Sequence, residues 1–122
     1  MTVPAVLTNT VSRILYGLPL IVFGLLHFMN SQGMSNLVPS YFPAPVFWVY
    51  LTGAALILAG GAIIANRKAK LASLLLGVML LIFALTIHLA GFLGGNQASL
   101  AQFLKDTALA GAAFALAGIL ED

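Results

Sequence analysis

The sequence predicts an all-α protein, a transmembrane four-helix bundle with up-down topology, and three observations support this prediction. Hydrophobic residues make up 61% of the 122 residues and charged residues only 7%, against roughly 25% charged in soluble proteins. The mean hydropathy is +1.09. Four long apolar stretches are joined by short polar segments, which favours antiparallel neighbours within a single membrane domain, residues 1–122.

Each apolar stretch is long enough, or nearly so, to cross about 30 Å of hydrocarbon at about 1.5 Å per residue. Between the first and second, residues 30–45 hold Gly33 and three prolines, a composition that cannot continue a helix. A basic turn at 66–70 separates the second from the third, and the Gly94-Gly95 pair ends the third. A short amphipathic lead-in precedes the fourth. The expected spans are about 11–29, 46–65, 71–93 and 104–120.

The positions of the basic residues predict the orientation of the chain. Arg13, Arg67, Lys68 and Lys70 lie on the side of the N-terminus and the central turn, and only Lys105 lies on the opposite side. Cytoplasmic loops retain Lys and Arg. We therefore expect both termini and the central turn to be cytoplasmic, and the other two connections to face outward.

Small residues predict where the helices pack, because helices in lipid associate through close backbone approach. In the first and second spans, glycines are seven residues apart. In the fourth span, small residues recur every three or four positions on one face. The residues concerned are Gly17 and Gly24, Gly53 and Gly60, and Ala108, Gly111, Ala115 and Gly118.

Polar residues gather in one predicted outer layer. The first and third spans both run outward, so His27 and His88 reach the same level. Lys105 and Asp106 begin the fourth span there, and Tyr41 lies on an adjoining loop. Asp106 is expected in the first turn of its helix, where a carboxylate caps the helix and is favoured by its dipole. If Asp106 points inward, it instead holds one imidazole in a chosen tautomer.

Composition also excludes several classes of function. The chain has no cysteine, so disulfides, thiolate nucleophiles and thiolate metal sites are absent, and a redox role needs a borrowed cofactor. No cluster of His and acidic residues predicts a metal site. A net charge of +2 is too small for a nucleic-acid partner. No span carries a buried acid, which argues against transport.

Several motifs occur in an order that resembles the DoxX-like membrane proteins. They are G-L-L-H-F at 24–28, V-P-S-Y-F-P-A-P at 38–45, V-Y-L-T-G at 49–53, the Gly60-Gly61 pair, the basic turn and I-H-L at 87–89. The match covers about residues 13–92. The resemblance implies a four-helix protein of the bacterial inner (plasma) membrane, related to a subunit of thiosulfate:quinone oxidoreductase and to proteins linked with oxidative-stress complexes.

The resemblance implies that four residues of this chain occupy motif positions of the family. They are His27, Tyr41, Tyr50 and His88. The chain departs from the pattern at two places. Leu56 stands where many relatives have a glutamate, and Thr86 stands where they have an asparagine before the second histidine. The missing carboxylate argues against a proton relay.

Three hypotheses remain open for the two histidines. In the first, they donate hydrogen bonds to the carbonyls of a quinone or similar lipid-soluble ligand in an outer-side pocket of an accessory redox subunit. In the second, they ligate haem. In the third, they clamp the helices in a non-enzymatic scaffold or assembly protein. Expected partners are the bilayer, redox-complex subunits or further copies of the chain. The candidate ligand-binding residues are His27, Asn30, Tyr41, Trp48, Tyr50, His88 and Asp106.

Overall fold

The computed structural model describes residues 1–122 and is entirely helical, without a strand, so the all-α class is confirmed. Besides α-helices it has two π-helices, η1 and η3, and one 3₁₀ turn, η2. The elements in order are η1 (Val6–Val11), α1 (Ser12–Met29), α2 (Ser31–Met34), η2 (Ser35–Leu37), α3 (Pro45–Ala65), α4 (Ala69–Phe83), η3 (Ala84–His88), α5 (Leu89–Leu93) and α6 (Gln97–Ile119).

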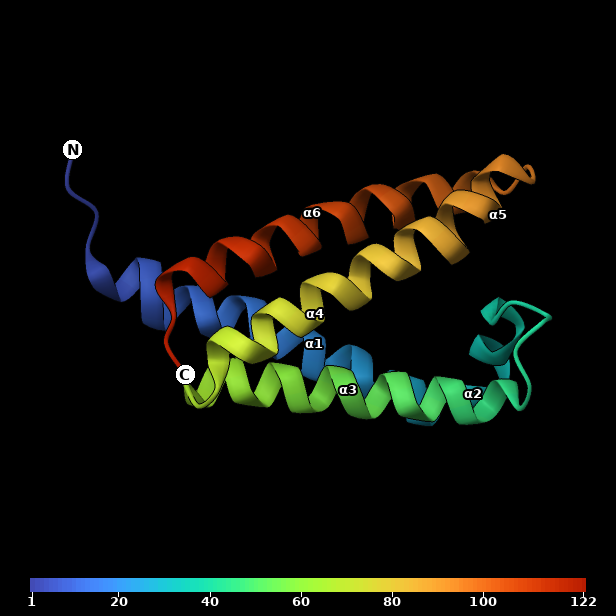
Figure 1. Cartoon of the computed structure of the whole chain (residues 1–122), viewed down its shortest axis with the longest axis horizontal. Helices are drawn as coiled ribbons and strands as arrows, with labels where there is room; N and C mark the ends of the chain where they lie inside the picture. Colours follow the sequence, from blue (N-terminus) through green and yellow to red (C-terminus); the bar gives the residue numbers. More distant parts are fainter.

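The long helices associate as two pairs. α1 packs mainly against α3, and α4 packs mainly against α6. α3 and α4 contact each other less extensively. The C-terminus lies near the turn that joins them, and the N-terminus projects away from the bundle at the same end of the molecule (Figure 1). From this end the two pairs diverge towards the end that carries α2 and α5.

Glycines bring α1 and α3 together, as their spacing predicted. A Cβ atom on Gly24 would lie 2.7 Å from the carbonyl oxygen of Gly53, and one on Gly60 would lie 2.7 Å from that of Gly17. These distances are shorter than a carbon atom tolerates, so the two backbones meet only because neither carries a side chain there.

The small face of α6 does not pack within the chain, contrary to the prediction. Added Cβ atoms on Gly111 and Gly118 would meet nothing within 4 Å. α6 instead buries a neighbouring face that includes Ala110, Ala113 and Leu116. Small residues permit close approach, but they do not determine which face a neighbour covers.

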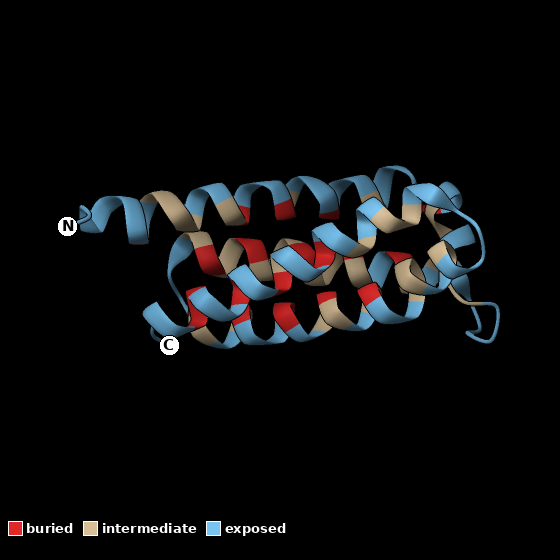
Figure 2. Ribbon diagram, turned by 90° about the horizontal axis from the view of Figure 1, so that it is seen from above, coloured by how far each residue is buried: buried red, intermediate tan, exposed pale blue.

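Burial is confined to the inner faces of the helices. Only 21 of 122 residues are buried. They lie on the faces that the helices turn to one another, and the outer faces are exposed (Figure 2). The main core cluster is Leu20, Leu56, Ile63, Leu76, Leu80 and Ala110. Many large hydrophobic side chains are exposed, far more than a soluble monomer carries.

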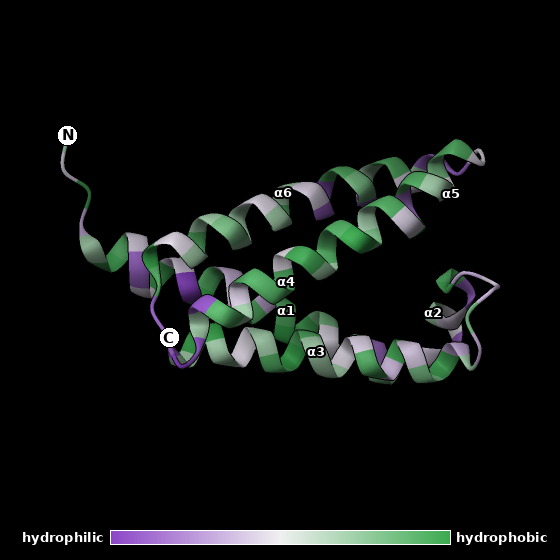
Figure 3. Cartoon of the chain, viewed as in Figure 1, coloured by the Kyte–Doolittle hydropathy of each residue, from purple (hydrophilic) through white to green (hydrophobic).

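Three helical stretches are long and apolar enough to cross a membrane, namely Val6–Met29, Pro45–Ala65 and Ala69–Leu93. Hydrophilic residues concentrate towards the ends of the molecule, but α6 also carries a hydrophilic band partway along its length (Figure 3). α6 is not among the three stretches, because Lys105 and Asp106 fall within it.

Two expected boundaries were wrong. The predicted loop at 30–45 contains the short helical turns α2 and η2. The predicted lead-in at 98–103 is the start of α6, which begins at Gln97 after the N-cap Asn96. The Asn96 side-chain oxygen accepts a hydrogen bond from the backbone N–H of Ala98 at 3.0 Å, so α6 begins two turns earlier than its apolar pattern suggests.

Four of the five basic residues, Arg13, Arg67, Lys68 and Lys70, lie towards the end that carries the chain termini. Arg13 Nη1 donates to the carbonyl oxygen of Ile64 at 2.7 Å and so satisfies the last turn of α3. The carboxylate of Asp122 accepts from the backbone N–H of Leu71 at 3.1 Å, in the first turn of α4. Both ends of the α3–α4 turn are therefore fixed by side chains from elsewhere in the chain.

Candidate functional site

A cavity of about 640 Å³ lies between the two helix pairs, towards the end where they diverge. Every long helix and the 30–45 connection contribute to its walls, which are mostly hydrophobic. A polar minority converges on it, as in sites that bind small apolar molecules. The polar and charged residues that line it include His27, Thr52, Thr86, His88, Asn96, Ser99, Gln102, Lys105 and Asp106.

His88 and Asp106 form a close imidazole–carboxylate pair in this cavity. Nδ1 of His88 lies 2.6 Å from Oδ2 of Asp106, and the two side chains are 17% and 10% exposed. The angle at Nδ1 is not that of an aligned hydrogen bond. An acidic group is costly in apolar surroundings unless it is paired, and the imidazole supplies that partner.

The position of Asp106 in its helix rules out the expected capping role. Asp106 is the tenth residue of α6 and therefore lies in its third turn, beyond the reach of the free N–H groups at the helix start. Asn96 caps α6 instead. The alternative inward orientation, against an imidazole, is the one that the structure contains.

The π-helix η3 presents His88 to α6. A π-turn holds one residue more than an α-turn, so it changes the direction of the side chains within it relative to a regular α-helix. Ala84, its first residue, is fully buried, and η3 packs against α6. Thr86 Oγ1 donates to the carbonyl oxygen of Ile82 at 2.6 Å, which supports the widened turn.

His27 lies on α1 beside the glycine contact with α3. Its Nδ1 donates to the carbonyl oxygen of Phe23 at 2.7 Å, one turn earlier. A Cβ atom on Gly53 would lie 2.8 Å from Cβ of His27, so α3 holds the base of this side chain closely. The ring makes no hydrogen bond with the side chain of Asn30, Thr86 or Tyr41.

Lys105 is a cavity residue that the sequence argument did not select. Its Nζ lies 4.9 Å from the centroid of the Phe23 ring, within the range of a cation–π contact. The sequence placed it with Asp106 at the start of the fourth span but did not include it among the candidate ligand-binding residues. Phe23, one turn before His27, was the sequence feature that could have predicted the inward position of Lys105.

Aromatic residues of the 30–45 connection and of α3 line the cavity as well. Trp48 Nε1 donates to the carbonyl oxygen of Pro43 at 2.8 Å, and the Trp48 ring packs edge-on against Phe42 at 5.2 Å. Phe42 in turn packs against Tyr41 at 5.0 Å. Tyr41 and Trp48, two of the predicted residues, therefore belong to the cavity.

The structure does not bring Asn30 and Tyr50 to the cavity. Tyr50 stacks on Phe28 at 5.3 Å, and its hydroxyl accepts from Ser31 Oγ at 3.2 Å. The Asn30 side chain lies against Gly33 in the adjoining turn. These contacts join α2 to α1 and α3.

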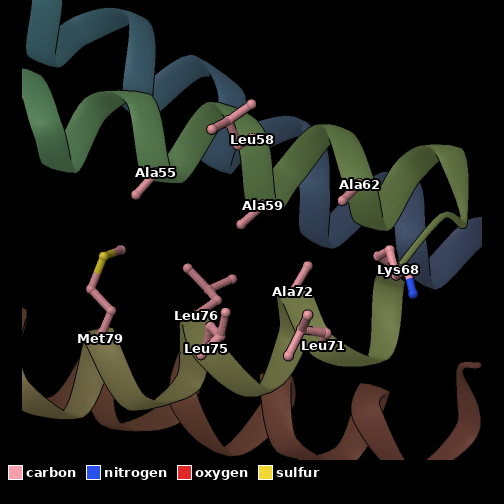
Figure 4. A pocket seen from close by; sticks show the side chains of 10 residues that line it. All are labelled: Ala55, Leu58, Ala59, Ala62, Lys68, Leu71, Ala72, Leu75, Leu76 and Met79. Carbon is pink, nitrogen blue, oxygen red and sulfur yellow. The ribbon is translucent and has the colours of Figure 1, made fainter. Parts of the chain in front are cut away.

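A second, smaller hollow of about 350 Å³ lies between α3 and α4 (Figure 4). Alanines, leucines and one methionine line it, and Lys68 at one end is its only charged residue. It has no set of converging polar groups. The larger cavity is therefore the candidate site. No group of three His, Cys, Asp or Glu side chains that could hold a metal ion occurs in the chain.

Fold and site together define a class: a helical protein with helices of membrane-spanning length, whose internal cavity contains two histidines and an aspartate. The chain belongs to a family described as a domain of unknown function (DUF8561), which matches residues 16–105. This match includes both histidines and ends one residue before Asp106. No curated protein and no solved structure matches the chain.

Proposed function

We propose that this chain is an inner-membrane protein that binds a quinone or a similar lipid-soluble molecule in the 640 Å³ cavity. The single observation that carries the proposal is the placement of His27, His88 and Asp106 on the walls of one mostly hydrophobic cavity. Quinones partition into lipid and need few polar contacts, and an imidazole–carboxylate pair is suited to a head group that changes its protonation on reduction.

The proposed membrane arrangement is a four-helix up-down bundle with both termini cytoplasmic. The exposed hydrophobic surface and the three apolar stretches support insertion. Arg13, Arg67, Lys68 and Lys70 favour the cytoplasm for their end of the molecule. The cavity, which Lys105 and Asp106 of α6 line, then lies towards the outer side.

Labelling of single cysteines tests this orientation, because the natural chain has none. Ser40 and Arg67 are both exposed, at opposite ends of the molecule. In intact cells, an impermeant maleimide should modify the Ser40→Cys variant and leave the Arg67→Cys variant unmodified. The reverse pattern would place the cavity at the cytoplasmic side and refute the proposed orientation.

The motif resemblance to DoxX-like proteins places the proposed ligand in a redox context. An accessory subunit of a quinone-reactive complex would hold the quinone while a partner supplies electrons, which suits a chain without cysteine or a metal cluster. Co-purification with such a partner tests this part of the proposal separately from ligand binding.

Trp48 offers a direct assay, because it is the only tryptophan and it lines the cavity. Titration of a decyl-benzoquinone into the protein in lipid nanodiscs should quench its fluorescence saturably. His88→Ala should weaken binding about tenfold, the effect of losing about 1.4 kcal/mol. Tyr50→Phe, outside the cavity, should match the wild type. Unchanged binding in His27→Ala and in His88→Ala, with loss of thermal stability alone, would instead support the non-enzymatic scaffold.

Haem ligation is the second candidate, and one observation favours it. Nδ1 of His27 is engaged by a backbone carbonyl and Nδ1 of His88 by a carboxylate, the outer-shell partners that ligating histidines use. Nε2 of each ring makes no bond within the chain. Addition of hemin to the purified protein tests this, with a sharp Soret band that is lost in His27→Ala as the expected sign of ligation.

A further inference from the structure

We infer that the cavity accepts its ligand as a hydrogen-bond donor: a lipid-soluble molecule with a hydroxyl head group, such as an alkylphenol or a hydroquinone, placed against Nε2 of His27. The inference rests on the proposed ligand-binding function and specifies the chemistry of the ligand. It also reverses the expectation that His27 donates a hydrogen bond to a ligand carbonyl.

The argument begins with the hydrogen bond at Nδ1 of His27. Its partner is the carbonyl oxygen of Phe23, at 2.7 Å. A carbonyl only accepts, so Nδ1 carries the proton. In a neutral imidazole one nitrogen donates and the other accepts. Nε2 of neutral His27 is therefore an acceptor.

His27 has no charged partner of its own. The one imidazole–carboxylate pair in the chain involves His88 and Asp106. Lys105 Nζ lies over the ring of Phe23, the residue whose carbonyl oxygen accepts from His27. That carbonyl is therefore the partner that fixes which nitrogen of the His27 ring carries the proton.

Nε2 of His27 is available to a ligand. It makes no hydrogen bond within the chain and is not among the side-chain atoms that are both buried and unpartnered, and His27 is one of the residues that line the cavity. A ligand carbonyl placed against this lone pair would meet acceptor with acceptor. A ligand hydroxyl would complete the hydrogen bond.

His88 differs from His27 in its partner. Its Nδ1 lies 2.6 Å from Oδ2 of Asp106 and not against a backbone carbonyl. The acceptor argued for here is therefore Nε2 of His27, on the wall formed by α1.

A matched pair of redox-inert probes tests the inference. 4-Nonylphenol donates a hydrogen bond and 4-nonylanisole, its methyl ether, does not, while their tails are identical. Each probe is titrated into protein in nanodiscs that already holds a decyl-benzoquinone. Recovery of Trp48 fluorescence measures displacement of the quinone. Concentrations are expressed as mole fractions in the bilayer. We expect the phenol to bind about tenfold more tightly than the ether in the wild type. In His27→Phe, which keeps an aromatic ring, the ratio should fall to about one, and in Tyr50→Phe it should stay at about ten.

The outcomes separate this inference from the proposed function. Equal displacement by the two probes in the wild type, or a ratio that survives in His27→Phe, overturns the hydroxyl-donor inference and leaves the cavity as a ligand site. Absence of saturable quenching by the quinone and of binding by either probe, measured by calorimetry, overturns both. A wild-type ratio of about one would overturn the inference even if His27→Phe does not fold.

Discussion

Replacement of Gly53 by alanine should push α1 and α3 apart and displace His27. The added Cβ would lie 2.8 Å from Cβ of His27 and 3.0 Å from the carbonyl oxygen of Gly24. Carbon atoms in van der Waals contact are about 3.5–4.0 Å apart, so the helices must separate by about 1 Å to relieve the overlap. The atoms involved are backbone or next to it, and neither can rotate away.

The same helix provides a matched control. A Cβ on Gly61 would meet nothing within 4 Å. Both substitutions gain about 1 kcal/mol of helix propensity, so the difference between them isolates the overlap. Overpacking of this kind costs about 1–3 kcal/mol, and we expect Gly53→Ala to be less stable than Gly61→Ala by that amount.

Unfolding by sodium dodecyl sulfate, followed by circular dichroism, measures the difference, and Trp48 quenching reports whether the cavity changes with it. The quinone affinity should fall in Gly53→Ala and remain unchanged in Gly61→Ala. Equal stability of the two variants would mean that α1 and α3 do not approach closely at Gly53, and the account of how His27 is held would be wrong.

Two further predictions concern contacts outside the cavity chemistry. Tyr16 Oη donates to the carbonyl oxygen of Leu109 at 2.6 Å and joins α1 to α6, so Tyr16→Phe should destabilise the protein by about 1 kcal/mol in the same unfolding assay, whereas Tyr41→Phe, at an exposed hydroxyl, should not. Asn96→Ala removes the acceptor for the N–H of Ala98 and should cost about 1 kcal/mol, with faster amide exchange limited to the first turn of α6; exchange spread along the whole helix would contradict a capping role.

The glycine contact of α1 and α3 was predictable because it depends on spacing alone. Residues seven apart lie on one face of a helix, and two such faces without side chains can meet whatever else the fold does. The same reasoning failed at Gly111 and Gly118, since a small face permits contact without supplying a partner. The all-helical class followed as directly, because composition and the length of the apolar stretches leave few alternatives.

The candidate site was predictable only in part. The shared level of His27 and His88 followed from the order of the spans, and both residues line one cavity. The prediction for Asp106 depended on the first residue of α6. An apolar pattern predicts the start of a helix poorly when its first turns are polar. The N-cap residue Asn96 was the better indication of that start. The direction of Tyr50 depends on how α3 is rotated about its axis, which packing decides.

Because η3 is a π-helix, the number of residues at 84–88 affects the shape of the cavity wall. A π-turn is a local insertion, so the α-helical segments on either side keep the faces that they pack. Removal of one residue there, such as the exposed Leu85, would return the segment to an ordinary α-helix and leave α4 and α5 in place. In this fold the deletion or insertion of one residue in η3 can therefore remodel the cavity wall without changing the helices around it. The site can change in evolution independently of its scaffold.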